Sequence, residues 1–156
     1  MINITLPDGS VRKYQKGTTA MEVATSISEG LARNVLAAKI NGNVSDASIK
    51  IESDCNLQLL TWNDQEGKST MWHSSAHLMA EALEELYPGV KFGIGPPIEN
   101  GFYYDVDLGS HSLSADELTK VEVKMLELAR KNLVFERKEV SKKDAISFFT
   151  GKGDEY

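Results

Sequence analysis

Apolar and polar residues alternate in short runs along the first sixty positions of the chain. Residues 2–6 alternate in this way, a Pro-Asp-Gly turn follows at 7–9, and a second run covers 11–14. A period of two residues is typical of strands with one buried face, and a tight turn between two such runs predicts a hairpin. Thr19, three residues before Glu22, forms a capping-box pattern, which predicts that a helix begins there.

Further strands are expected after this helix. A mostly apolar run at 35–40 ends at Asn41-Gly42, a dipeptide typical of hairpin turns, and Val44 begins the returning strand. Ile51 and the run at 57–61 complete the pattern. This β-β-α-β-β order, with one helix across a mixed sheet, predicts a ubiquitin-like β-grasp module of the α+β class.

The spacing of apolar residues then changes from two to between three and four. Residues 63–68 contain no apolar side chain, which predicts a boundary between a β-grasp module at 1–62 and a second domain at 69–156. Ser69 or Thr70 is expected to cap a long helix that ends at a Pro-Gly stop signal. The apolar stripe of this helix consists of Trp72, Ala76, Met79, Leu83 and Leu86.

The rest of the second domain predicts a hairpin, two helices and one more strand, again an α+β arrangement. Strands are expected at 90–94 and 102–106, joined by a loop whose two adjacent prolines cannot donate to a strand ladder. Ser114 opens a second capping box, and Ser141 can cap a short helix. Between these two helices, 134–140 is expected to form a strand.

Composition narrows the class of protein. Hydrophobic residues make up 41% and charged residues 26% of the 156 positions, which is typical of globular protein and sufficient for two separate cores. No apolar run is long enough to cross a bilayer, and no signal-peptide pattern opens the chain. A single cysteine cannot form an internal disulfide. We therefore expect a cytoplasmic protein without membrane contact.

The net charge of −6 is unevenly distributed. Residues 1–62 hold 6 basic and 6 acidic side chains, whereas 63–156 hold 11 basic and 17 acidic ones. Nucleic-acid binding usually requires a basic surface, and the short basic clusters here are typical of solvated faces. Charge alone therefore does not indicate an RNA-handling protein.

Two of the three histidines, His73 and His77, lie four residues apart within the predicted long helix. This spacing places both imidazoles on one helix face, beside the apolar stripe and not within it. Imidazoles titrate near neutral pH and can move protons or bind metals. Such a pair is equally typical of ordinary helix packing, so the pair by itself leaves both interpretations open.

The sequence gives little support for a metal site or for a nucleophilic serine or cysteine. A zinc protease would need glutamate after the first histidine, where Ser74 stands, and a zinc site needs at least three protein ligands. The other candidates are His111 in a loop and Cys55 in the first module. Cys55 is expected to be a small, half-buried residue, and Ser74 and Ser75 point away from the histidines next to them. No metal site is predicted.

The histidine pair is followed by the segment Phe92-Gly-Ile-Gly-Pro-Pro-Ile-Glu-Asn-Gly-Phe-Tyr-Tyr-Asp-Val106. In combination, the two motifs resemble the editing domain of the threonyl-tRNA synthetases, which removes mischarged serine from tRNA. The first sixty residues resemble the small TGS-type module that precedes this domain. The resemblance extends over the whole chain in a consistent order, and it implies a β-grasp module followed by the first part of an α+β editing domain.

The resemblance also implies a set of site residues. His73, His77, Tyr104 and Asp105 occupy the positions that match the family's editing site. The resemblance implies that the family completes this site with one particular lysine and a Cys-x-x-x-His element, both further along than the 156 positions of this sequence. We therefore expect an N-terminal fragment that is inactive alone and holds no cofactor.

For the parent ligase the resemblance implies ATP, magnesium and zinc in a separate catalytic domain, tRNA as partner and a homodimer. Editing is needed because serine lacks one methyl of threonine, which is worth only about 1–3 kcal/mol of discrimination. Two alternatives remain open: a non-catalytic β-grasp module that binds RNA or another ligand, and an independent metal hydrolase. The alanyl-tRNA synthetases share the histidine spacing, but the leading β-grasp module favours the threonyl family.

Overall fold

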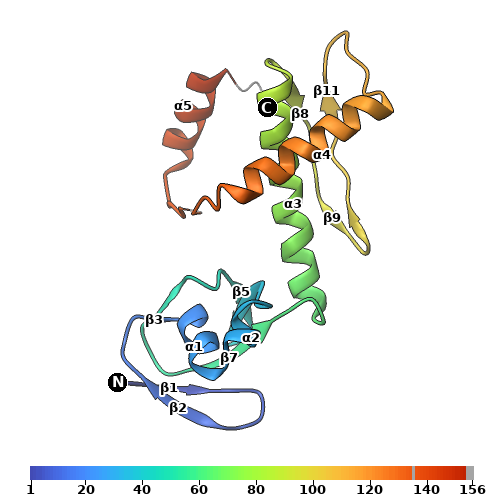
Figure 1. The fold of residues 1–156 in the computed structure, drawn as a ribbon. Helices are drawn as coiled ribbons and strands as arrows, with labels where there is room; N and C mark the ends of the chain where they lie inside the picture. The colour runs from blue at the N-terminus through green and yellow to red at the C-terminus, as the bar shows by residue number, and fades with distance from the viewer. Residues whose placement is uncertain (135, 154–156) are drawn as a thin grey trace. The chain divides into compact units, whose positions relative to one another are not determined.

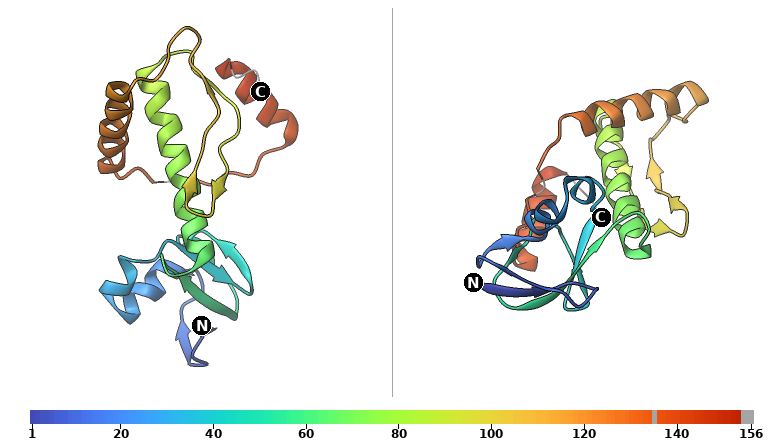
Figure 2. Two further views of the ribbon diagram at one scale, coloured as in Figure 1. Left: turned by 90° about the vertical axis from the view of Figure 1, so that its right-hand side faces the viewer. Right: turned by 60° about the horizontal axis from the view of Figure 1, so that its bottom comes forward.

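The computed structural model describes residues 1–134 and 136–153 (Figures 1 and 2). The chain divides into two compact units, Met1–Trp72 and His73–Tyr156, called below the N-terminal and C-terminal units. Within the described residues no helix has the length and apolar character needed to cross a membrane.

A five-stranded mixed sheet forms the N-terminal unit, with strand order β2-β1-β7-β4-β5. The first strand pairs parallel with β7, and the other neighbours are antiparallel. Two further short strands, β3 and β6, pair antiparallel in a separate two-stranded ladder. The strands are β1 (Ile2–Thr5), β2 (Val11–Tyr14), β3 (Thr18–Thr19), β4 (Ala37–Ile40), β5 (Asn43–Ser45), β6 (Lys50–Ile51) and β7 (Cys55–Leu60).

One face of this sheet is covered by α1 (Ala20–Ile27). The predicted capping box is confirmed, because Thr19 accepts from the backbone of Glu22 and Glu22 accepts from the backbone of Thr19. A short helix, α2 (Glu29–Ala32), follows. The buried core joins helix and sheet through Ile2, Ile4, Ala20, Val23, Ala38, Ile51, Cys55 and Leu57. The predicted β-grasp fold and α+β class are confirmed.

The long helix α3 (Gln65–Leu86) begins earlier than the sequence predicted. Ser69 and Thr70 were expected to cap it, but both lie inside the helix, and Thr70 donates its hydroxyl to the carbonyl of Glu66 at 2.9 Å. The helix is entered at Asp64, whose carbonyl accepts from Lys68 at 3.0 Å. The Asp64 carboxylate turns back to accept from the Thr61 backbone at 2.8 Å. This turn lets the polar residues before Ser69 become helical.

Residues 63–68, where the sequence predicted a domain boundary, make contacts within the N-terminal unit. Gly67 is buried, and a Cβ added there would lie 2.9 Å from the Thr61 carbonyl carbon and closer still to its oxygen. Glu66 pairs with Lys39 on β4, and this ion pair lowers the pKa of the Glu66 carboxyl. The first turns of α3 therefore pack on the sheet of the N-terminal unit. The domain boundary predicted within 63–68 stays a prediction.

In the C-terminal unit, α4 and a hairpin pack on the remainder of α3. The predicted apolar stripe is confirmed, since Ala76 and Leu83 are buried and Met79 and Leu86 are partly buried. The core cluster of Ala82, Leu83, Val121 and Leu128 also contacts Phe92 and Val106 of the hairpin. The elements are β8 (Lys91–Phe92), β9 (Pro97–Ile98), β10 (Gly101–Phe102), β11 (Val106–Asp107), α4 (Ala115–Arg130) and α5 (Lys142–Lys152).

A β-bulge interrupts the two strands that were predicted at 90–94 and 102–106. Phe92 pairs with Val106 and Pro97 pairs with Phe102, so 93–96 (four residues) face 103–105 (three residues). Gly93 donates to the carbonyl of Asp105, while Asp105 donates to the carbonyl of Ile94. Asp105 thus faces two residues at once, which defines the bulge. The bulge shortens the strand predicted at 90–94 to β8 and splits the one predicted at 102–106 into β10 and β11. The loop predicted between them was wrong at Pro97, which lies in β9 and pairs with Phe102.

The strand predicted at 134–140 is wrong for the described residues of that stretch, none of which is in a strand. Val134 and Val140 are 87% and 61% exposed, and a strand needs a partner to satisfy its backbone. Position 135 lies outside the described residues. The helix α5 does begin at a Ser141 cap, as predicted, although Ile146, Phe148 and Phe149 on it are exposed.

We predict that Gly67→Ala destabilises the N-terminal unit. Alanine gains about 0.5–1 kcal/mol of helix propensity over glycine, but the added Cβ meets the Thr61 backbone, which cannot move aside without shifting β7 or α3. Overpacking of this kind costs about 1–3 kcal/mol, so the clash outweighs the propensity. Both tryptophans of the chain, Trp62 and Trp72, lie in this unit with ring centroids 5.3 Å apart, and their fluorescence reports the urea midpoint.

A matched control for this variant is Gly30→Ala, in a helix of the same unit. An added Cβ at Gly30 meets only the Ser28 hydroxyl, at an ordinary 3.4 Å, so the midpoint should stay the same or rise. An unchanged midpoint for Gly67→Ala would contradict the close packing of α3 on Thr61.

Candidate functional site

The histidine pair stands on one face of α3, as the spacing predicted. The Nε2 atoms of His73 and His77 are 2.9 Å apart, and their ring centroids are separated by 4.7 Å. Both side chains are exposed, one turn apart and outside the buried stripe. At this distance one Nε2 carries a hydrogen and the other offers its lone pair, so the pair can hold or pass on one proton.

Two effects disfavour the charged form of His77. The larger effect is that neighbouring atoms shield part of the His77 ring from water, although the residue as a whole stays exposed. The neighbouring charge of His73 adds to it, and together they lower the pKa of His77 below its ordinary 6.5. A lowered pKa keeps an imidazole neutral near pH 7, and a neutral imidazole can accept a proton. His77 is therefore suited to act as a base.

Tyr104 and His77 line the same depression, which measures about 700 Å³. Tyr104 is half-buried and packs edge-on against Phe92, with ring centroids 5.4 Å apart and an interplanar angle of 67°. Its ring lies over Gly95, where an added Cβ would approach ring atoms to 2.5–2.8 Å. The hairpin thus supplies an aromatic wall, and α3 supplies the imidazole.

Asp105 does not reach this depression. Adjacent residues of an extended segment point to opposite faces, and Asp105 instead lines a smaller hollow of about 270 Å³ with Lys91, Phe92 and Gly93. Lys91 and Phe92 line both hollows. The structure therefore brings together three of the four predicted site residues, His73 through its contact with His77, and places Asp105 in the adjoining hollow. The catalytic roles of all four stay a prediction.

Several charged residues of the depression were not singled out from the sequence. Glu81 and Glu84 follow His77 by four and seven residues on α3, and both line the depression. Lys91 and Lys152 do so from the hairpin and from α5. The helical repeat of three to four residues from His77 was the one signal that could have indicated the two glutamates. The lysines depend on tertiary packing and had no such signal.

The remaining candidates lie away from the histidine pair. His111 lines a different hollow and stands near Tyr87, with ring centroids 6.3 Å apart. Cys55 is buried in the N-terminal core at the start of β7, and burial raises the pKa of its thiol. In the described part of the chain, no three His, Cys, Asp or Glu side chains are grouped so that they could hold a metal ion.

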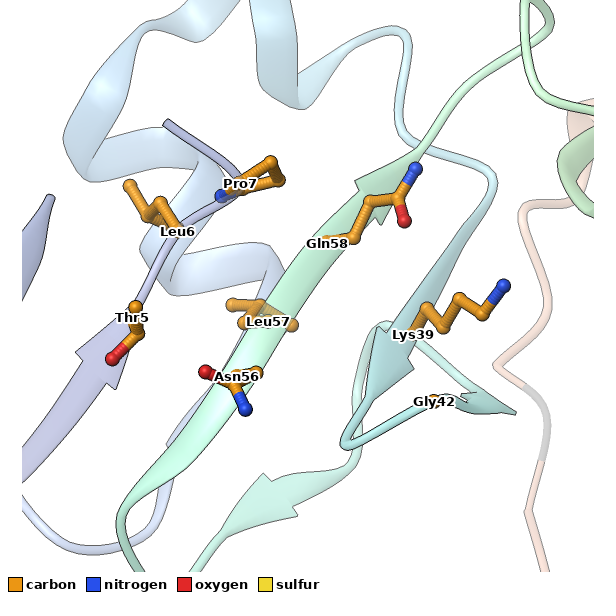
Figure 3. Close-up of a pocket in the computed structure, with 8 residues that line it drawn as sticks. All are labelled: Thr5, Leu6, Pro7, Lys39, Gly42, Asn56, Leu57 and Gln58. Atoms are coloured by element: carbon orange, nitrogen blue, oxygen red, sulfur yellow. The ribbon is translucent and has the colours of Figure 1, made fainter. Parts of the chain in front are cut away.

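A second depression, of about 340 Å³, lies on the sheet of the N-terminal unit (Figure 3). Asn56 and Gln58 from β7 and Lys39 from β4 carry polar groups there, and Thr5 adds a hydroxyl. The Lys39 ammonium is already paired with Glu66, so its charge is largely compensated. The described residues that line this hollow offer hydrogen-bonding groups, and Lys39 is the one titratable residue among them.

Comparison with known families first defines the class of the N-terminal unit. Residues 2–61 match the family model of the TGS domain, in agreement with the β-grasp strand order. The chain therefore carries a TGS domain at its N-terminus.

The chain as a whole is similar to threonine–tRNA ligases. It is 66% identical over 156 residues to the threonine–tRNA ligase of Cytophaga hutchinsonii, 57% identical to that of Parabacteroides distasonis and 51% identical to that of Phocaeicola vulgatus. All of this chain is matched in each case, but it spans only 24% of the length of these relatives. The resemblance to threonine–tRNA ligases that was stated from the sequence is confirmed.

We predict that His73→Ala raises the pKa of His77 only part of the way to its ordinary value. The variant removes the repulsion from His73, while burial, the larger cause, stays. The titration of the imidazole Cε1 proton by NMR measures this change. Ser74→Ala, on the neighbouring exposed position, is the control and should leave the titration unchanged.

The lowered pKa of His77 also sets the sign of a stability effect. In the unfolded chain His77 regains its ordinary pKa of 6.5, so just below that pH the unfolded state binds more protons than the folded one. Stability is thus fully present above pH 6.5 and declines as pH falls through the lowered pKa. A wild-type His77 that titrates at or above 6.5 would contradict the inferred surroundings.

Proposed function

We propose that this chain is the N-terminal region of a threonine–tRNA ligase and contributes to the hydrolytic editing of mischarged seryl-tRNA. The observation that carries the proposal is the shared depression, which is lined by both Tyr104 and His77, the partner of His73. The full-length similarity to threonine–tRNA ligases supports the same conclusion. The editing reaction is the part that the similarity alone does not reach.

The proposed reaction is hydrolysis of the ester that joins serine to the terminal ribose of tRNA. A water molecule attacks the ester carbonyl carbon, the bond to the ribose oxygen breaks, and that oxygen leaves as a hydroxyl. The neutral His77 accepts a proton from the water, and the contact with His73 provides a route to hand it on. Acid–base help of this type contributes about 10²–10⁴-fold to a rate.

The surroundings of the pair suit an aminoacyl ester. The half-buried ring of Tyr104 and the ring of Phe92 limit the space available to an amino-acid side chain. Glu81 and Glu84 place negative charge on the same helix face as His77, where the ammonium group of the amino acid would be attracted. Lys91 and Lys152, at the same depression, offer positive charge to tRNA phosphates.

For the parent protein we propose threonine attachment to tRNA with ATP, in a homodimer in the cytoplasm. ATP, magnesium and zinc would serve the catalytic domain of that parent. The described residues of this chain do not fit a zinc site, because no three suitable side chains are grouped. Nothing in the proposed hydrolysis depends on a bound metal.

A non-catalytic binding role of the TGS domain is the second candidate. The observation that favours it is the depression on the sheet, with amide, hydroxyl and ammonium groups from three neighbouring strands (Figure 3). Such groups can bind RNA or a small polar ligand without any chemistry. The two roles are compatible, since they use different units of the chain.

The test of the editing proposal uses a chimera. This chain replaces the matching residues of the Cytophaga hutchinsonii threonine–tRNA ligase, with which it shares 66% identity. We expect the chimera to hydrolyse seryl-tRNA, and His73→Ala or His77→Ala to slow that hydrolysis by about 10²–10⁴-fold. Ser74→Ala should change the rate by less than about twofold, as exposed substitutions usually do.

Threonine attachment by the same chimera serves as the folding control and should be unaffected by these substitutions. A chimera that attaches threonine but leaves seryl-tRNA intact would refute the editing proposal.

We also propose that the 156-residue chain alone has little activity and binds zinc weakly. Catalytic groups act as a unit, and His73 and His77 are both exposed. Seryl-tRNA hydrolysis and bound zinc are measured on the isolated chain beside the chimera. Rapid hydrolysis by the isolated chain, abolished by His73→Ala, would show that it already contains a complete site.

A further inference from the structure

The hairpin of the C-terminal unit contains a one-residue shift that determines what lies opposite Tyr104. In the ladder of β8 and β11, Phe92 pairs with Val106, so the numbers of paired residues add up to 198. In the ladder of β9 and β10, Pro97 pairs with Phe102, and the numbers add up to 199. The register therefore shifts by one residue between the two ladders. In the first register Tyr104 would face Ile94. In the second register it faces Gly95. The bulge at Gly93 and Ile94 makes this change.

The Tyr104 ring occupies the space that a side chain at position 95 would fill. A Cβ on Gly95 would stand 2.5 Å from Cδ2, 2.7 Å from Cε2 and 2.8 Å from Cγ of the Tyr104 ring. Ordinary contact begins at 3.4 Å, so the ring would have to withdraw by about 3.4 − 2.5 = 0.9 Å or change rotamer. Gly95 has no positive φ, so backbone strain does not explain glycine here; the close ring does.

The placement of the Tyr104 ring determines whether it lines the depression that contains His77. With the ring over Gly95, Tyr104 packs edge-on against Phe92 and lines the depression that contains His77. Asp105, the next residue, lines the smaller adjoining hollow and not this depression. Bulges beside sites of this kind commonly redirect a side chain.

We propose that Gly95 is a positioning residue of the editing site: with the neighbouring bulge, it holds the Tyr104 ring at the wall of the depression that His77 also lines. This inference rests on the proposed editing function for its catalytic consequence. The placement of the ring by Gly95 stands on the geometry alone, so the two parts are tested separately.

The structural part is tested on the 156-residue chain with a double-mutant cycle. Gly95→Ala should shift the Tyr104 and Phe92 ring resonances and reduce the folding equilibrium constant by about 5–150-fold, the range for overpacking. In a Tyr104→Ala background the same Gly95→Ala should change that constant by less than about twofold. If Gly95→Ala prevents folding, the double variant should restore it.

The matched control is Gly151→Ala, because an added Cβ there meets nothing within 4 Å. It should leave the ring resonances in place. An equal loss from Gly95→Ala with and without the Tyr104 ring, or a double variant that stays unfolded, would overturn the assigned contact.

The catalytic part is tested in the chimera with the Cytophaga hutchinsonii ligase. Gly95→Ala should lower kcat for seryl-tRNA hydrolysis by about tenfold or more, since a displacement of about 1 Å can cost up to 10²-fold, while KM and threonine attachment stay unchanged. With Tyr104→Ala already present, Gly95→Ala should add no further loss.

The outcomes separate the two claims. An unmutated chimera that leaves seryl-tRNA intact refutes the editing proposal, and the double-mutant cycle still decides whether Gly95 places the ring. Hydrolysis that is fast in the chimera and unchanged by Gly95→Ala overturns the positioning role.

Discussion

The helical backbone of α3 is the constraint on which the candidate site depends. One turn of helix holds His73 and His77 with their rings 4.7 Å apart, and no other element supports both. Most of the stability of a helix within a protein comes from the packing of its apolar face. Leu83 is buried against α4, and Glu85 pairs with Lys124 at 3.1 Å and with Lys131 at 3.7 Å. Contacts on one face of α3 thus preserve the spacing on the other.

A second constraint comes from the hairpin, which supplies the Tyr104 ring to the depression that His77 lines. Its strands are only two residues long, so hydrogen bonds alone would hold them weakly. Phe92 and Val106 anchor the hairpin in the core shared by α3 and α4. The bulge then sets the register that places Tyr104 over Gly95. Helix and hairpin each supply one half of the depression, and the editing proposal needs both.

Periodicity and capping patterns predicted the β-grasp order, the stripe on α3 and the shared face of the histidines, because each depends on residues near one another in sequence. Three features depended on specific contacts that periodicity and capping patterns do not encode, and they were missed. Helix α3 starts early because Asp64 bonds to Thr61 and Gly67 packs on its carbonyl. The hairpin register depends on the bulge. The described residues of 134–140 lack a pairing strand, so β-propensity alone misled. The motif placed Tyr104 and Asp105 together, but alternation along the chain separates them.

The central claim is that the chemistry lies between α3 and the hairpin, and not on the sheet of the TGS domain. The most direct measurement is an NMR titration of the 156-residue chain with a serine amide of 3′-amino-3′-deoxyadenosine, a stable mimic of the ester. The account predicts saturable shifts at His73, His77 and Tyr104, and none at Lys39 or Gln58. Shifts confined to Lys39 and Gln58, with the histidines unmoved, would contradict it and favour the binding role of the TGS domain.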